Sequence, residues 1–323
     1  MPRVIRVGGA QLGPLQKSDT RKVAVDRMLA LLEKAHAEGC QLVVFPELAF
    51  TTFFPRWHYD DQREIDGFFE SSMPNDDVQP LFDKAREYGI SFYLGFAEIA
   101  DENGERHHYN SSILVDRTGT IVAKYRKIHL PGHGTYDPDR IFQHLEKKYF
   151  EPGNLGFPVW RFMGGLFGMC ICNDRRWPET YRVMGLQGVE MVLLGFNTPS
   201  TNSQRPDEGH DLRSFHNDLS VQSGAYQNGT WVVAVAKAGV EDGHELLGGS
   251  VIVHPSGQIV ARSQTLGDEL IVADCDLDEC NFIKETVFDF DRHRRIEHYG
   301  LITEQTGVVR PDDVATEPLL RKM

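Results

Sequence analysis

The chain has 323 residues, of which 41% are hydrophobic and 25% are charged, so it is large enough for a substantial core and has an ordinary globular composition. Its net charge is −13, from 34 basic and 47 acidic residues. This balance argues against nucleic acid or an anionic membrane as the main partner, but it leaves room for a local basic pocket that binds a small anion.

The cysteines indicate a reducing compartment. There are five, an odd number scattered along the chain, so we expect no disulfide framework. Residues 4–10 are too short and too interrupted by Arg6 and glycines to form the apolar part of a signal peptide. No stretch approaches the roughly 20 apolar residues that a membrane span needs. We therefore expect a cytoplasmic protein.

Apolar periodicity predicts the elements of the first half of the chain. Asp19-Thr20 is a candidate cap for a helix that ends at Gly39, and a second helix covers residues 78–88 before Gly89. Predicted strands cover residues 4–11, 42–45, 90–99, 109–115 and 121–125. The last two are joined by a turn at residues 116–119, which predicts a β-hairpin. A polar, histidine-rich loop follows over residues 127–153.

In the second half, Pro178 opens a predicted helix that runs to residue 187, and further helices cover residues 212–227 and 277–286. Predicted strands cover residues 157–161, 166–171, 191–196, 231–236, 251–253, 258–261 and 270–274. The mixture of hairpins and helices predicts an α/β protein with two layers of sheet and helices outside. We expect a single domain over residues 1–302 and a polar tail over residues 303–323.

Three polar residues each lie just past the end of a predicted apolar strand: Glu47, Lys127 and Cys172. Strand ends meet at the edge of a sheet, so residues far apart in sequence can converge there. Taken singly, each is more often structural: a solvated glutamate, a surface lysine, a buried cysteine. Together they predict a nucleophilic thiol with a base and a cation beside it.

The segments around these residues resemble the nitrilase superfamily of carbon–nitrogen hydrolases. They are Phe45-Pro-Glu47, residues 125–130 (Tyr-Arg-Lys-Ile-His-Leu) and residues 172–179 (Cys-Asn-Asp-Arg-Arg-Trp-Pro-Glu). Within the superfamily, residues 51–58, 127–133, 142–146, 149–153 and 223–229 are most similar to the N-carbamoyl-D-amino acid amidohydrolases, the D-carbamoylases. The resemblance covers roughly residues 4–302 and implies a four-layer α-β-β-α sandwich.

The resemblance implies catalytic roles for Glu47, Lys127 and Cys172, with Glu146 as a second carboxylate beside the lysine. Physical reasoning supports the first three: Glu47 can take the thiol proton, and Lys127 can stabilise the thiolate and the oxyanion. The backbone N–H of Asn173, directly after the nucleophile, is a candidate second oxyanion donor. This chemistry requires no metal and no cofactor.

Two adjacent arginines, Arg175 and Arg176, follow the nucleophile. A guanidinium matches a carboxylate in shape and charge, so we expect at least one to bind the α-carboxylate of an N-carbamoyl amino acid, although an internal ion pair is the alternative. The resemblance places His144, Asn197 and Thr198 at the substrate as well.

The histidines between residues 129 and 144 are also possible metal ligands, but their spacing fits no standard motif. We interpret His129 instead as a hydrogen-bonding residue behind the site. Residues 200–213 are more polar and acidic than the D-carbamoylase pattern, which bears on the preferred side chain.

The expected partner is a small-molecule N-carbamoyl amino acid, and the resemblance implies a homodimer or homotetramer. Two alternatives remain open. One is a related amide hydrolase, such as a β-ureidopropionase-like enzyme acting on N-carbamoyl-β-alanine. The other is a non-catalytic scaffolding member of the fold, against which the intact set of Glu47, Lys127 and Cys172 argues.

Overall fold

The structure, a computed structural model, describes residues 2–311. These residues form two units, one that ends at Phe288 and one that begins at Asp289. The second unit contains the short helices α8 (Phe290–His293), η3 (Ile296–His298) and α9 (Gly300–Glu304). The structural division thus falls before the boundary at 302 that the sequence predicts, and residues 312–323 of the predicted tail lie outside the described residues.

The first unit is built on two six-stranded sheets, and its first sheet has the order β14-β1-β2-β3-β4-β5. The bounds are β1 (Val4–Gln11), β2 (Leu42–Val44), β3 (Ser91–Glu102), β4 (Glu105–Val115), β5 (Ile121–Arg126) and β14 (Glu269–Asp276). The pairs β1–β2 and β2–β3 are parallel, and the outer pairs are antiparallel.

The second sheet has the order β13-β12-β9-β8-β7-β6, and its central strands β7, β8 and β9 are parallel. The bounds are β6 (Val159–Phe162), β7 (Gly165–Ile171), β8 (Met191–Phe196), β9 (Trp231–Ala236), β12 (Val251–Val253) and β13 (Ile259–Arg262). Strands β8 and β9 are buried at every residue, which explains their continuous apolar sequences.

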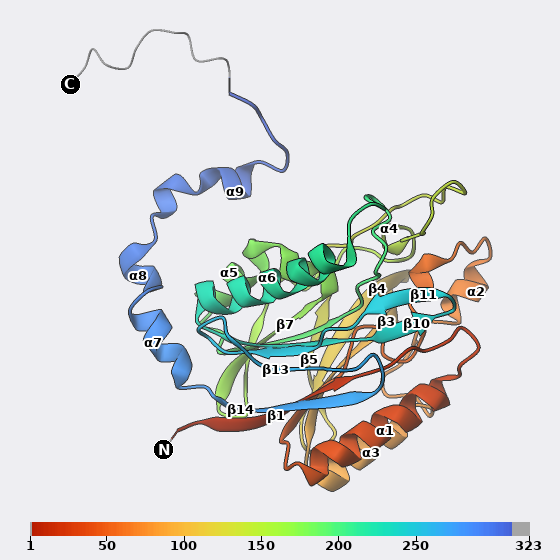
Figure 1. The fold of residues 1–323 in the computed structure, drawn as a ribbon, viewed down its shortest axis with the longest axis horizontal. Helices are drawn as coiled ribbons and strands as arrows, with labels where there is room; N and C mark the ends of the chain where they lie inside the picture. Colours follow the sequence, from red (N-terminus) through yellow and green to blue (C-terminus); the bar gives the residue numbers. More distant parts are fainter. Residues whose placement is uncertain (1, 312–323) are drawn as a thin grey trace. The chain divides into compact units, whose positions relative to one another are not determined.

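Helices cover the outer face of each sheet, and Figure 1 shows α1 and α3 on one side and α5 and α6 on the other. The long helices are α1 (Arg21–Ala37), α3 (Gln79–Tyr88), α5 (Pro178–Leu186) and α6 (His210–Asn228). Thr20 caps α1 through its side chain, and Gly89 ends α3 in the left-handed conformation, as the sequence predicts. The predicted four-layer α-β-β-α sandwich is confirmed.

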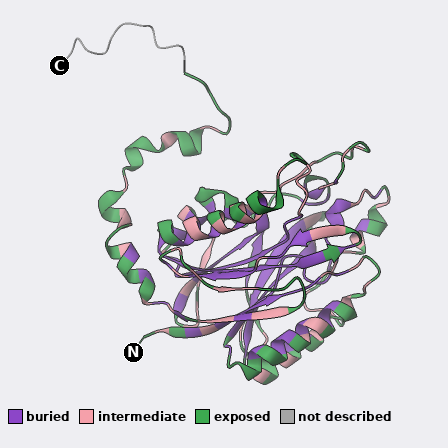
Figure 2. Ribbon diagram, viewed as in Figure 1, coloured by how far each residue is buried: buried purple, intermediate pink, exposed green. Residues whose placement is uncertain are grey.

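The buried residues lie where these layers meet (Figure 2). One core fills the space between the sheets and another lies between the first sheet and helices α1 and α3. Between the sheets, the fully buried Tyr93 hydroxyl on β3 donates to the carbonyl of Cys170 on β7 and accepts from the N–H of Gly195 on β8, both at 3.1 Å. This residue therefore ties the two sheets together directly beneath the strand ends.

Several short elements complete the fold, and most of them do not follow from the sequence pattern. They are α2 (Gln62–Asp66), α4 (Glu146–Tyr149), η1 (Phe54–Arg56), α7 (Glu279–Glu285) and the hairpin of β10 (Ala238–Glu241) and β11 (His244–Leu247). Of these, only α7 is predicted. No helix among residues 2–311 combines the length and the apolar character that crossing a membrane requires.

Candidate active site

The predicted nucleophile, Cys172, lies at a tight turn directly after β7. Its φ is 48°, in the left-handed region, which costs a residue with a side chain of the order of 1–3 kcal/mol. The 3₁₀ turn η2 (Cys172–Arg176) follows and leads into α5. The thiol is buried, and Sγ lies 3.4 Å from the carbonyl oxygen of Asn197. The structure thus confirms the predicted strand-to-helix turn and adds a short 3₁₀ segment to it.

The buried carboxylate of Asp174 fixes this turn from inside. Its Oδ2 accepts from the N–H of Ile171 at 3.1 Å and from the hydroxyl of Tyr125 at 2.7 Å. Its Oδ1 lies 2.9 Å from both the backbone N and the ring Nδ1 of His129. The carbonyl of His129 in turn accepts from the side chain of Asn173 at 3.0 Å. His129 therefore supports the turn at Cys172 indirectly, through its hydrogen bonds with Asp174 and Asn173.

Glu47 follows β2, and its backbone lies close to Gly195 on β8 of the second sheet and to Gly95 on the neighbouring strand β3. A Cβ on Gly195 would lie 2.4 Å from the backbone N of Glu47, and one on Gly95 would lie 2.7 Å from its Cα. Only glycine at these positions allows such an approach. The Glu47 carboxylate accepts from Asn110 Nδ2 at 2.7 Å and from the N–H of Asn197 at 2.9 Å. Both sheets thus hold this carboxylate in place.

Lys127 follows β5 and joins two carboxylates. Its Nζ lies 2.8 Å from Glu47 Oε1 and 2.6 Å from Glu146 Oε2, and all three side chains are fully buried. An isolated buried charge is very unfavourable, so the three groups stabilise one another. The structure therefore brings together Glu47, Lys127 and Glu146, whose positions in sequence are widely separated.

The buried charges determine the protonation of the thiol and the lysine. Burial and the charge of Glu47 raise the pKa of Cys172 above its usual value, although Lys127 opposes the shift. Burial alone would lower the pKa of Lys127, but the charges of Cys172, Glu146 and Glu47 outweigh it and the pKa lies well above its usual value. A neutral thiol thus lies near a charged lysine, and the thiol needs a base to become nucleophilic.

The remaining oxygen of Glu146 is bonded to His144. The distance from His144 Nε2 to Glu146 Oε1 is 2.9 Å. Burial opposes ionisation of Glu146, but Lys127 and His144 outweigh it and lower its pKa. His133 instead faces the loop that follows β8, with Nε2 3.3 Å from Ser203 Oγ. Within residues 2–311, no three His, Cys, Asp or Glu side chains are arranged to hold a metal ion.

Arg175 is largely engaged inside the protein. Its Nη1 donates to the carbonyl of Cys172 at 2.6 Å, and its Nη2 donates to Thr198 Oγ1 at 3.0 Å and to Asn217 Oδ1 at 2.5 Å. Its guanidinium also lies over the ring of Phe196, 4.4 Å from the centroid. Arg175 therefore holds the turn at Cys172 against the end of β8, and it also lines the pocket.

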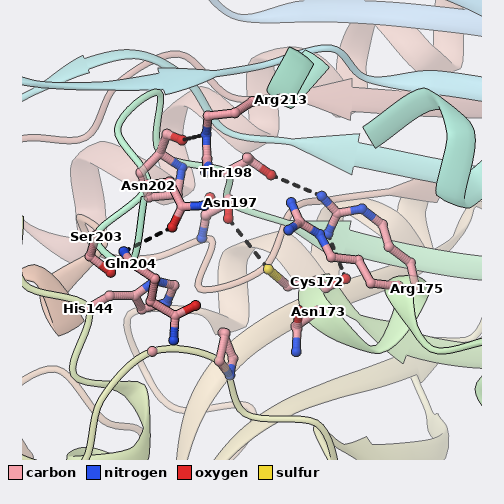
Figure 3. Close-up of a pocket in the computed structure, with 14 residues that line it drawn as sticks. His144, Cys172, Asn173, Arg175, Asn197, Thr198, Asn202, Ser203, Gln204 and Arg213 are labelled. Atoms are coloured by element: carbon pink, nitrogen blue, oxygen red, sulfur yellow. Dashed lines mark hydrogen bonds between the residues drawn. The ribbon is translucent and has the colours of Figure 1, made fainter. Parts of the chain in front are cut away.

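Arg176 makes no hydrogen bond or ion pair with the described part of the chain. It is exposed and lines a pocket of about 110 Å³. Cys172 lines the same pocket (Figure 3). The pKa of Arg176 is lowered to about 10, mainly because the guanidinium loses hydration in the pocket and also because Arg175 and Arg213 repel it. Arg176 therefore remains a cation at neutral pH. No Asp or Glu among residues 2–311 lines this pocket.

The pocket brings together all six of the predicted substrate-binding residues. These are His144, Asn173, Arg175, Arg176, Asn197 and Thr198. Sequence reasoning missed Asn110, which donates to Glu47, and Asn217, which accepts from Arg175. It also missed Arg213, which lines the pocket. For Asn110, the one available signal is a polar residue within a strand that is otherwise buried and apolar.

The chain matches the carbon-nitrogen hydrolase family over residues 6–285. It belongs to this family. Among its relatives, an N-carbamoylputrescine amidase from Oryza sativa subsp. japonica is 30% identical over 303 residues, which cover 90% of this chain and 92% of the relative. A citrullinase from Francisella tularensis subsp. tularensis is 27% identical, with 90% of this chain and 96% of the relative covered. The chain is therefore a carbon–nitrogen hydrolase that acts on amides.

Solved structures agree on the fold. A carbon-nitrogen hydrolase from Helicobacter pylori G27 superimposes with a TM-score of 0.77 at 23% identity, over 93% of this chain and 98% of that one. An amidase mutant from Nesterenkonia sp. AN1 has a TM-score of 0.67 at 21% identity, over 91% and 94% of the two chains. In that amidase, the active-site cysteine carries the acetamide moiety of fluoroacetamide.

Proposed function

We propose that this hydrolase converts N-carbamoyl-D-amino acids to the D-amino acid, carbon dioxide and ammonia through a carbamoyl-cysteine intermediate. The residues involved are Glu47, Lys127, Glu146 and Cys172. The ureido group as substrate is supported by the named activities of the relatives, which include N-carbamoylputrescine amidase. The D configuration is supported by the resemblance of residues 127–133 and 142–146 to the D-carbamoylases.

In the first half-reaction, Glu47 takes the proton of Cys172 and Sγ attacks the ureido carbonyl carbon. Lys127 Nζ and the backbone N–H of Asn173 stabilise the oxyanion that forms. The bond to the terminal nitrogen then breaks, and Glu47 returns the proton to the leaving ammonia. Glu146 keeps Lys127 charged and oriented through their 2.6 Å contact.

In the second half-reaction, Glu47 takes a proton from water, and the hydroxide attacks the carbamoyl carbon. The carbon–sulfur bond breaks, and the thiol regains its proton. The released N-carboxy amino acid separates into carbon dioxide and the free amino acid. A buried acceptor, Asn197 Oδ1, has no hydrogen-bond partner in the described part of the chain and suits a donor on the ureido group.

The single observation that carries the substrate class is Arg176, a guanidinium that has no hydrogen-bond or ion-pair partner among residues 2–311 and lies at a pocket that no carboxylate of these residues lines. A substrate carboxylate would complete the fork of this arginine. The terminal ammonium of N-carbamoylputrescine would instead place a second positive charge near Arg176, with no lining carboxylate of the described residues to neutralise it. An α-amino acid with a distal ureido group, such as citrulline, would bring an ammonium that no lining carboxylate pairs.

The proposed assembly is a homodimer or homotetramer. Apolar side chains stand exposed on the outer helices, and they include Trp177 beside α5, Leu186 on α5, and Phe215 and Leu219 on α6. Exposed apolar residues grouped on neighbouring helices are typical of a protein–protein interface. A second copy of the chain would cover them.

The test is ammonia release from matched N-carbamoyl-D- and L-amino acids, N-carbamoylglycine, N-carbamoyl-β-alanine, N-carbamoylputrescine and citrulline, with Cys172→Ala as control. We expect turnover of the D-amino acid derivatives and glycine, and none in the variant. Arg176→Gln should lower kcat/KM for these substrates about 10- to 100-fold, the effect of one charge-assisted hydrogen bond, but should not affect a carbamoyl alkylamine in this way. Preference for carbamoylputrescine over every carboxylate substrate would refute the proposal.

A further inference from the structure

One wall of the pocket is formed by residues 199–209, part of the connection between β8 and α6, and this 199–209 loop is polar. It contributes Asn202, Ser203 and Gln204 to the lining. No Leu, Ile, Val, Met, Phe, Tyr or Trp of the described chain lines the pocket, and its aliphatic side chains are Pro131 and Pro199. Small-molecule pockets are usually lined mostly by apolar groups. This lining therefore favours a ligand that is polar along its whole length.

The 199–209 loop is tied down on both sides. Asn202 Nδ2 donates to Glu208 Oε2 at 2.5 Å, and Arg213 Nη1 donates to the same oxygen at 3.2 Å. Arg213 Nε also donates to the carbonyl of Pro199 at 2.8 Å, and Ser203 lies 3.3 Å from His133. These contacts occupy the polar side chains of Asn202 and Ser203, so neither is free to adapt to a substrate.

Gln204 is the exception. Its backbone N–H donates to Asn202 Oδ1 at 3.1 Å, which fixes its position, but its side-chain amide makes no hydrogen bond within residues 2–311. In Figure 3, the sulfur of Cys172 lies between Gln204 and His144 on one side and Arg175 on the other. The amide of Gln204 can both donate and accept a hydrogen bond.

We propose that Gln204 is a specificity-determining residue and that the hydrolase prefers N-carbamoyl amino acids with a short, hydrogen-bonding side chain over apolar side chains of equal size. This rests on the proposed function, which fixes the ureido carbon at Cys172 and the carboxylate at Arg176. In this proposal, the third substituent of the α-carbon is the one that faces the 199–209 loop. A hydroxyl there pairs with the amide of Gln204, whereas a methyl group displaces water from it without replacing the hydrogen bond.

The experiment compares N-carbamoyl-D-serine with N-carbamoyl-D-2-aminobutyrate, which differ by a hydroxyl in place of a methyl group. N-carbamoylglycine, which has no side chain, is the reference. Ammonia release gives kcat/KM for each, on whichever enantiomer is turned over. We expect the serine derivative to exceed the aminobutyrate derivative about tenfold in the wild type, the effect of one hydrogen bond.

The variant Gln204→Leu should bring this ratio, with each value taken relative to N-carbamoylglycine in the same variant, close to one. The matched control is Gln264→Leu, an exposed loop glutamine outside the pocket, which should keep the wild-type ratio. Equal or faster turnover of the aminobutyrate derivative by the wild type, or an unchanged ratio in Gln204→Leu, would overturn this proposal alone. Failure to turn over even N-carbamoylglycine would overturn the proposed function and this proposal with it.

Discussion

The close approach of the sheets at Glu47 makes Gly195→Ala a sharp test of how the site is built. The added Cβ would lie 2.4 Å from the backbone N of Glu47 and 2.6 Å from the carbonyl carbon of Pro46, whereas ordinary contact begins at 3.4 Å. The difference, 3.4 − 2.4 = 1.0 Å, must come from displacing backbone, because no flexible side chain is involved. A displacement of this size moves Glu47 away from Lys127 and Cys172.

Misplacement of a reacting group by about 1 Å lowers catalysis about a hundredfold, and overpacking a core costs about 1–3 kcal/mol of unfolding free energy. We expect both effects in Gly195→Ala, measured as kcat/KM for ammonia release and by urea unfolding. The control is Gly267→Ala, where an added Cβ meets nothing within 4 Å and φ is not positive. Wild-type activity and stability in Gly195→Ala would refute the argument that the Gly195 contact positions Glu47.

Four further changes test other parts of the site. Lys127→Met removes the cation that lies between two buried carboxylates, so it should lower the free energy of unfolding by about 3–5 kcal/mol. The loss should be smaller at pH 5 than at pH 8, because the carboxylates can then take up protons, and an equal loss at both pH values would contradict this. The raised pKa of Cys172 keeps its thiol neutral at pH 7, so the rate of its alkylation by iodoacetamide should still rise with pH at pH 9. Cys172→Ala is the control, and a rate that levels off near pH 7 would show a depressed pKa instead. Glu208→Gln weakens the contacts that Glu208 makes with Asn202, Arg213 and His216. Proteolysis within the 199–209 loop should therefore become faster, and KM should rise more than kcat falls. Unchanged proteolysis would show that Glu208 does not hold the loop in place. Phe215→Glu places a charge on the exposed face of α6 and should shift the protein to monomers in light scattering; a species of unchanged mass would place the interface elsewhere.

Much of the fold follows from the sequence because local patterns and burial agree. Strands β8 and β9 are predicted to the residue, since each is a continuous apolar run enclosed on both faces. The hairpin of β10 and β11 is missed because its strands are four residues each and carry charged residues. Single-sequence patterns do not distinguish such strands from loops.

In the same way, some parts of the site can be located from local sequence patterns and others cannot. The positions of Glu47, Lys127 and Cys172 follow from their places at strand ends, which sequence patterns can locate. The partner of Arg175 does not follow, because Asn217 lies on α6 and meets the arginine only through tertiary packing. From the sequence alone, either arginine could bind a carboxylate or make internal contacts. Only the structure shows that Arg175 makes internal hydrogen bonds and that Arg176 makes none within residues 2–311.

The two sheets supply different parts of the proposed chemistry. Glu47 and Lys127 extend from the first sheet, whereas Cys172 and Asn197 extend from the second. The proton transfer between Glu47 and Cys172 therefore crosses the interface between the sheets, and its geometry depends on their spacing. Tyr93, which bonds to both β7 and β8 from β3, sets that spacing together with Gly195, which lies against the backbone of Glu47. Residues buried between the sheets and out of contact with substrate should thus affect turnover as strongly as residues that line the pocket.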